Sequence, residues 1–182
     1  MIERILILGT GLLGSSTGLA LRAAGFGGEI DGWDKNASES AEALRLGAID
    51  SVVVDPVAAA VSSELIVLAT PVYAILDWME QLAPILVPDQ LVTDVGSTKA
   101  TITETGNRLF NRARRAAFLP GHPMAGKEIS GAAAADAGIF RGAAWIFIRG
   151  IAGSLATHRE DCDASACRPA YARSCGDGGA GA

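Results

Sequence analysis

The stretch Arg4-Ile5-Leu6-Ile7-Leu8-Gly9-Thr10-Gly11-Leu12-Leu13-Gly14 decides the fold of this chain. Its first five residues are β-branched residues and leucines after a single arginine, which predicts a buried strand that ends at Gly9. Residues 12–24 are small and apolar at helical spacing, which predicts a helix that Gly25 ends. The stretch therefore predicts a strand, a glycine-rich turn and a helix in direct succession.

The glycines of this turn match the pattern G-x-G-x-x-G in the strand–turn–helix context that gives the pattern its meaning. Gly9 allows the tight turn, Gly11 lets the backbone approach a pyrophosphate, and Gly14 lets the helix pack close to the strand. The pyrophosphate would lie at the helix N-terminus, where free N–H groups and the helix dipole favour an anion. We expect a dinucleotide site formed by Gly9, Thr10, Gly11, Leu12, Leu13 and Gly14. A glycine-rich turn without a ligand is the alternative.

Asp34 follows a second predicted strand, Glu29–Trp33. A carboxylate at this place accepts hydrogen bonds from the ribose hydroxyls of a dinucleotide and repels the extra phosphate of NADP. Lys35 could relieve part of that repulsion. The position favours NAD as the cofactor, and an ordinary exposed loop acid is the alternative interpretation of Asp34.

Strand-like and helix-like segments alternate along the rest of residues 1–150. Further strands are expected at 51–54, 65–69, 91–94, 117–119 and 144–148, and further helices at 37–46, 72–83 and 98–114. Ser97 is the candidate N-cap of the last helix. The alternation predicts an α/β protein of the Rossmann type, in which a doubly wound, mostly parallel sheet carries helices on both faces.

Composition restricts the partners of the chain. Of its 182 residues, 49% are hydrophobic and 19% charged, and the net charge is -5. This balance argues against nucleic acid or an anionic membrane surface as the main partner. No apolar run approaches the roughly 18 residues of a membrane helix, and the N-terminus shows no charged leader or cleavage site. We therefore expect a cytoplasmic protein.

The character of the sequence changes after Gly150. Residues 151–182 contain few large apolar side chains, which predicts a low-complexity, disordered tail behind a dinucleotide-binding domain at 1–150. Cys162, Cys167 and Cys175 all lie in this tail. Their odd number and their spacing from His158 match no metal pattern, so we expect free thiols and no metal.

Three further segments are expected at the carboxyl edge of the sheet, where open α/β sheets bind their ligands. They are residues 69–72, 94–99 and 121–131, and each leaves a strand with small or polar residues. His122 is one of two histidines in the chain. In a loop after a strand, its neutral imidazole could accept a proton from a substrate hydroxyl while hydride leaves the adjacent carbon. A structural loop histidine has equal weight at this point.

Three motifs together resemble the prephenate and arogenate dehydrogenases of tyrosine biosynthesis. Gly121-His122-Pro123-Met124-Ala125-Gly126, with Glu128 and Ser130-Gly131, is similar to the family signature. Asp94-Val95-Gly96-Ser97-Thr98-Lys99 is similar to the second motif, and residues 9–16 fit the first. The resemblance implies NAD-dependent oxidative decarboxylation of prephenate to 4-hydroxyphenylpyruvate. Arogenate as substrate, another small Rossmann oxidoreductase and a non-catalytic dinucleotide-binding module are the alternatives.

The resemblance also implies roles for single residues. His122 is the expected catalytic base, and Ser97 orients His122 or the substrate hydroxyl, unless it only caps the helix. Thr70 and Pro71 would line the nicotinamide side of the cofactor. Substrate carboxylates would lie near Gly126, Lys127 and Glu128, although Lys127 stands where a small polar residue is expected.

In one respect the chain departs from the family. Its members carry a second, largely helical domain that forms the dimer and supplies a substrate-binding arginine, and nothing after Gly150 resembles that domain. Residues 151–182 look like translation of a coding region out of frame, with a genuine short tail as the alternative. We expect an intact cofactor half and an incomplete substrate site, so that activity is reduced or lost.

Overall fold

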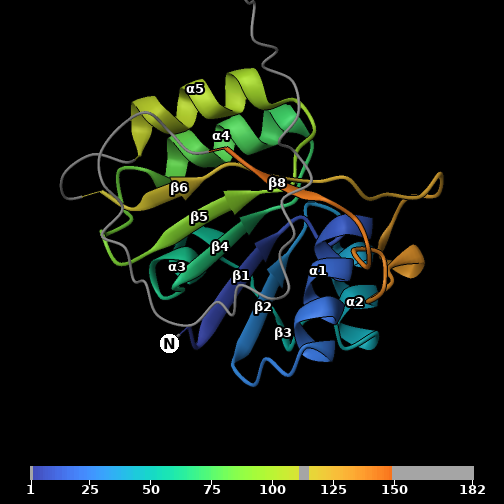
Figure 1. Cartoon of the computed structure of the whole chain (residues 1–182). Helices are drawn as coiled ribbons and strands as arrows, with labels where there is room; N and C mark the ends of the chain where they lie inside the picture. Colours follow the sequence, from blue (N-terminus) through green and yellow to red (C-terminus); the bar gives the residue numbers. More distant parts are fainter. Residues whose placement is uncertain (1, 111–114, 149–182) are drawn as a thin grey trace, which may run out of the picture.

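A six-stranded parallel sheet runs through the computed structural model, which describes residues 2–110 and 115–148 (Figure 1). Its strands are β1 (Arg4–Leu8), β2 (Glu29–Trp33), β3 (Ser51–Val52), β4 (Leu65–Leu68), β5 (Leu91–Asp94) and β6 (Ala117–Leu119). Their order is β3-β2-β1-β4-β5-β6, and every neighbouring pair is parallel. The strand order reverses between β1 and β4, which is the switch point of a doubly wound Rossmann sheet. The predicted fold class is confirmed.

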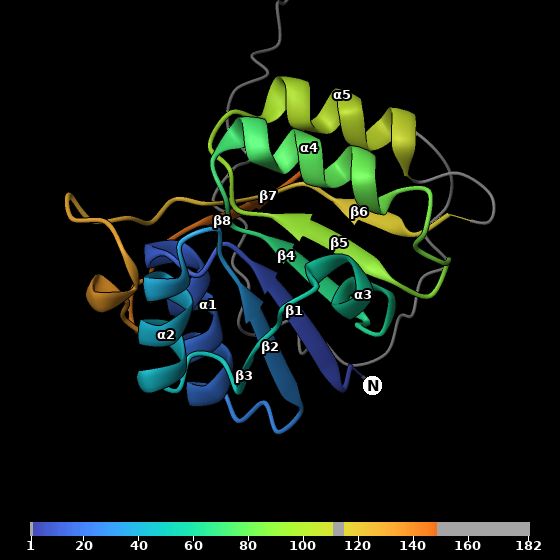
Figure 2. The ribbon, with the colours of Figure 1, turned by 180° about the vertical axis from the view of Figure 1, so that it is seen from behind.

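Helices cover both faces of this sheet (Figure 2). They are α1 (Leu12–Ala23), α2 (Ala37–Arg45), α3 (Pro56–Val61), α4 (Val72–Leu82) and α5 (Lys99–Leu109). Alternate residues of β1 face opposite cores: Ile5 and Ile7 pack with α1 and α2, whereas Leu6 and Leu8 pack with α3, α4 and α5. Because both faces are buried, the central strands are nearly continuous apolar runs.

A second, two-stranded sheet follows the main one. The antiparallel strands β7 (Gly121–Pro123) and β8 (Trp145–Phe147) place His122 opposite Ile146. Residues 124–144, here called the β7–β8 connection, contain the short 3-10 helix η1 (Ala132–Ala134). Figure 1 shows this connection beside α1 and α2, and Ala132 is buried in their core.

Several predicted elements change in the structure. The short helix α3 was not predicted, because six residues give no clear helical period; Asp55 caps it by accepting hydrogen bonds from the N–H groups of Val57 and Ala58. The strand expected at 51–54 is only Ser51–Val52. The helix expected at 98–114 starts at Lys99, and its N-cap is Thr98, so the N-cap prediction for Ser97 is wrong.

Other predictions concern residues that the structure does not describe. The tail at 151–182 and its three cysteines lie outside the described ranges, and so do residues 111–114 of the expected helix. Within residues 2–110 and 115–148, no helix is both long and apolar enough to cross a membrane. In the same residues, no three histidine, cysteine, aspartate or glutamate side chains gather as a group able to hold a metal ion.

The turn between β1 and α1 depends on close backbone contacts. Gly9 has a φ of 96°, and a Cβ added to it would lie 2.6 Å from the carbonyl of Ala69. A Cβ added to Gly14 would lie 1.8 Å from the carbonyl oxygen of Gly9, whereas one added to Gly11 would meet nothing within 4 Å. Packing therefore requires the first and third glycines, and the second leaves open space at the start of α1.

Replacing Gly14 with alanine should destabilise the fold by about 1–3 kcal/mol, the usual range for overpacking, because the new methyl group meets the Gly9 carbonyl. Urea unfolding measures the change. Gly11→Ala is the matched control, and its cost should stay under about 1 kcal/mol. Equal stability of the two variants would show that the contact between a methyl group at position 14 and the Gly9 carbonyl does not destabilise the fold.

Candidate active site

The carboxyl ends of the strands bring four segments of the chain together. Leu8 is paired with Leu68, and Leu68 with Asp94, so that β1, β4 and β5 end side by side. The last residue of β6, Leu119, is paired with Thr93. The glycine turn and the segments after β4, β5 and β6 thus leave the sheet at one edge, where the sequence predicts them.

The start of α1 offers an anion site at this edge. Gly11 is the N-cap of α1 and forms no side-chain capping hydrogen bond, so the helix presents the N–H groups of its first turn and its positive dipole end. Thr10 is buried beside it. The Thr10 hydroxyl lies 3.3 Å from that of Ser40, and the Thr10 carbonyl accepts a hydrogen bond from Ser15 at 2.6 Å.

Asp34 is held next to the same turn. One carboxylate oxygen accepts the N–H of Thr10 at 2.9 Å, and the other accepts that of Asn36 at 2.9 Å. Each oxygen has two lone pairs, so both can still accept a further donor. The side chain is partly exposed. Asp34 is therefore held beside the glycine turn with acceptor capacity to spare, and its role toward a ribose stays a prediction.

Thr70 is the second residue after β4 and lies beside Gly9. Its amide nitrogen is 2.8 Å from the place of a Cβ on Gly9, and among the described residues its buried hydroxyl has no hydrogen-bond partner. A buried hydroxyl without a partner is costly, so a polar group from a ligand would be stabilised here. Pro71, the exposed N-cap of α4, comes next. The open Gly11, the oriented Asp34 and the unpaired Thr70 hydroxyl all fit a dinucleotide.

Asp94 holds the second half of the site together. Its side chain is fully buried, and one oxygen accepts the N–H of Gly96 at 2.9 Å and a hydrogen bond from the Lys99 ammonium. The other oxygen accepts the N–H of Gly121 at 3.2 Å. Burial lowers the pKa of Lys99, and the Asp94 carboxylate opposes that change. One carboxylate thus joins the end of β5, the first turn of α5 and the start of β7.

Both predicted catalytic residues are neighbours of these contacts. Ser97 is exposed between Gly96 and Lys99, and His122 follows Gly121 directly. Asp94 therefore brings their backbones together, although no hydrogen bond joins the two side chains in the part of the chain that the structure describes. His122 lies in the strand β7, not in a loop as predicted, because residues 121–123 pair with β8.

The predicted substrate residues lie on the β7–β8 connection. Gly126, Lys127 and Glu128 are all exposed. The Lys127 ammonium donates to the carbonyl of Ala134 at 3.0 Å and lies 3.3 Å from the Asp136 carboxylate. The N–H of Gly138 and then Lys127 lower the pKa of Asp136. Lys127 thus contributes to the internal structure of the connection, and its role toward a substrate stays a prediction.

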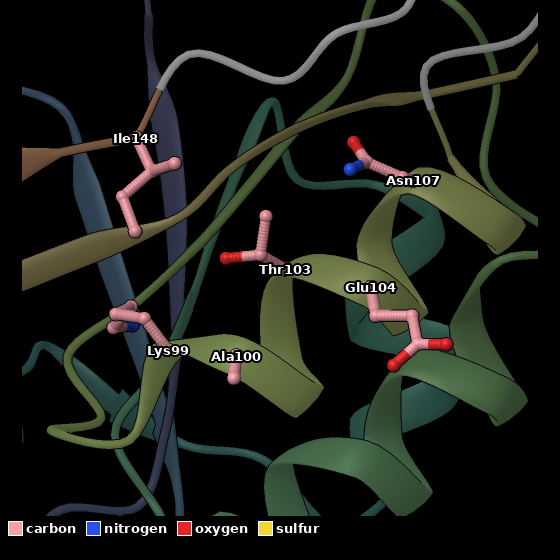
Figure 3. A pocket seen from close by; sticks show the side chains of 6 residues that line it. All are labelled: Lys99, Ala100, Thr103, Glu104, Asn107 and Ile148. Atoms are coloured by element: carbon pink, nitrogen blue, oxygen red, sulfur yellow. The ribbon is translucent and has the colours of Figure 1, made fainter.

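A cavity of about 460 Å³ lies along the outer side of α5 (Figure 3). The residues that line it are Lys99, Ala100, Thr103, Glu104, Asn107 and Ile148. Within the described part of the chain, the Thr103 hydroxyl is buried without a hydrogen-bond partner. The cavity adjoins the Asp94–Lys99 pair. The sequence carried no signal for it, because the α5 residues follow the ordinary spacing of one helix face and Ile148 joins them only through the fold.

This edge defines the class of the protein: it is a dinucleotide-binding domain of the Rossmann type. A family model described as "Prephenate dehydrogenase, nucleotide-binding domain" matches residues 17–150. The chain belongs to this family. The resemblance seen in the sequence is thereby confirmed, and so is NAD as the cofactor.

Curated relatives agree with this assignment. The chain is 40% identical over 146 residues to a prephenate dehydrogenase of Lactococcus lactis subsp. cremoris, with 80% of this chain covered and 40% of the relative. A prephenate dehydrogenase of Bacillus subtilis is 35% identical over 151 residues, with 82% and 40% covered. The chain thus spans about 40% of the length of these relatives.

Solved structures show the same partial coverage. Prephenate dehydrogenase from Aquifex aeolicus, in complex with hydroxyphenyl propionate and NAD+, superposes with a TM-score of 0.73 at 32% identity, covering 82% of this chain and 51% of that one. For Synechocystis arogenate dehydrogenase the TM-score is 0.70 at 30% identity, with 79% and 49% covered.

Replacing Asp94 with asparagine should destabilise the fold by about 3 kcal/mol, because the buried Lys99 ammonium loses its counter-charge. Lys99→Met tests the other partner. In the double variant no buried charge remains unpaired. Its loss of unfolding free energy should therefore be smaller than the sum of the losses in the two single variants. Urea unfolding of all four proteins completes the cycle, and strictly additive losses would show that the pair is not coupled.

Proposed function

We propose that this chain supplies the cofactor-binding half and the catalytic base of an enzyme that converts prephenate to 4-hydroxyphenylpyruvate by oxidative decarboxylation. The observation that carries the proposal is the buried Asp94 carboxylate, which joins the backbones beside Ser97 and His122 at the edge that holds the dinucleotide site. Membership of the prephenate dehydrogenase family supports the substrate class.

In the proposed reaction, bound NAD is the hydride acceptor. A ring nitrogen of His122 accepts the proton of the substrate hydroxyl while the hydrogen on the same carbon leaves as hydride. The ring carboxylate departs as carbon dioxide, its bonding electron pair completes the aromatic ring, and the proton held by His122 returns to the ring oxygen to give the phenol. Ser97 orients the hydroxyl or the imidazole, and Lys127 and Glu128 lie on the segment that faces the substrate carboxylates.

Arogenate is the second candidate substrate, since an arogenate dehydrogenase is among the similar structures. Arogenate carries an ammonium group where prephenate carries a keto group, and the exposed Glu128 carboxylate offers a counter-charge for it. NADH formation with each substrate separates the two. Absence of turnover with both, together with tight NAD binding, would favour a binding module without catalysis.

Asp34→Ala should narrow the preference for NAD over NADP by about tenfold, because one carboxylate near the ribose contributes on the order of 1–2 kcal/mol of discrimination. Isothermal calorimetry with both dinucleotides measures the change. The matched control is Asp55→Asn, which alters an acidic N-cap away from the turn. Tighter binding of NADP than of NAD by the unmodified chain would contradict the role of Asp34.

His122→Asn should lower the turnover number about 100-fold or more, because a general base acts mainly in the transition state. NAD affinity should stay within about threefold, since the contacts of the glycine turn and Asp34 do not involve His122. Steady-state rates and calorimetry measure the two effects. Near-normal turnover would make His122 structural, and a large loss of NAD binding would place it in the cofactor site.

A further inference from the structure

Two hydrogen bonds attach the β7–β8 connection to the helices of the cofactor site. The N–H of Ala132 donates to the Glu39 carboxylate on α2 at 2.5 Å, and the N–H of Asp136 donates to the Ser16 hydroxyl on α1 at 3.0 Å. Ser16 is fully buried, and Ala132 is 1% exposed in the core beside the two helices. The connection is therefore anchored at its middle rather than only at its two strand ends.

The turn before η1 is shaped for the Glu39 carboxylate. Gly131 has a φ of 92°, a backbone conformation that residues with a side chain rarely adopt. A Cβ at Gly131 would also lie 3.2 Å from a Glu39 oxygen. The left-handed glycine directs the next N–H, that of Ala132, at the carboxylate. A hydrogen bond to a charged acceptor is roughly twice as strong as one between neutral groups.

Glu39 is also close in sequence to residues of the cofactor site. The next residue, Ser40, has its hydroxyl 3.3 Å from that of Thr10, and the N–H of Thr10 donates to Asp34. The first turn of α2 thus contacts the glycine turn through Ser40 and the β7–β8 connection through Glu39. A continuous set of contacts links the ribose-binding acid to the segment that carries Lys127 and Glu128.

We propose that Glu39 is a positioning residue, whose carboxylate holds the substrate-facing β7–β8 connection in register with the NAD site. The inference rests on the proposed function for the meaning of that segment. Glu39 touches neither cofactor nor substrate in this role. It acts through its hydrogen bond with the Ala132 N–H. When NAD binding makes the glycine turn more rigid, this hydrogen bond makes residues 124–144 more rigid as well.

Hydrogen–deuterium exchange of the full chain, with and without saturating NAD, tests the proposal. In Glu39→Ala, amides in residues 124–144 should exchange about tenfold faster than in the unmodified chain, since a charged hydrogen bond is lost. NAD should slow exchange in this segment about threefold or more in the unmodified chain and leave it unchanged in Glu39→Ala. Glu39→Gln keeps an acceptor oxygen and should restore at least half of the protection.

The matched control is Glu42→Ala, one turn further along α2, where among the described residues the carboxylate pairs with Arg45 alone. It should leave exchange in residues 124–144 unchanged. Because Glu39 is also an acid in the first turn of α2, a loss confined to that helix, or spread over the whole sheet, would overturn the proposal. So would NAD protection in Glu39→Ala equal to that of the unmodified chain.

The same measurements distinguish a failure of the proposed function from a failure of the role of Glu39. If calorimetry shows no NAD binding to the unmodified chain, the enzymatic assignment is lost, but the NAD-free comparison of Glu39→Ala, Glu39→Gln and Glu42→Ala still decides whether Glu39 holds the connection. If NAD binds and residues 124–144 exchange alike in all four proteins, the positioning role is lost and the assignment stands.

Discussion

The arrangement of the segments around Ser97 and His122 depends on one buried charge, the Asp94 carboxylate. Removing a carboxylate from water is costly unless hydrogen bonds and a counter-charge replace the lost solvation. Gly96, Lys99 and Gly121 supply these contacts from three different elements. Their positions are therefore not independent: a shift of any one would leave the buried carboxylate partly unsatisfied. This requirement places β7, which is outside the main sheet, at the end of β5.

The cofactor half is built on a different constraint, the close backbone contacts of the glycine turn. Gly9 and Gly14 are required by neighbouring backbone atoms, whereas the space around Gly11 is open. The G-x-G-x-x-G spacing marks this turn within residues 9–14, although the carbonyl that Gly9 meets belongs to the distant Ala69. For this reason the sequence was sufficient to predict the turn, the strands Arg4–Leu8 and Glu29–Trp33, and the position of Asp34.

The sequence was less informative about the second half of the site. The positions of the strands β4 and β5 were predicted within one residue, but β7 and η1 have no periodicity of their own and form through distant partners. The partners of Asp94 include Gly121, and Glu39 bonds to Ala132, far along the chain. A polar residue at the end of an apolar strand was the available signal for Asp94, and for Glu39 no signal distinguished it from an ordinary surface acid.

The glycine-turn contacts and the buried Asp94 carboxylate hold different parts of the candidate site. The hydrogen bonds that orient Asp34 and Thr10 come from residues 10–40, and Gly9 packs against Ala69, which follows β4. The residues proposed to face the substrate instead lie on a connection that leaves the sheet, and Met124, Ile129 and Phe147 on the connection and β8 are more than half exposed. The proposed cofactor site is therefore held by packing against the sheet, whereas the proposed substrate residues lie on an exposed connection.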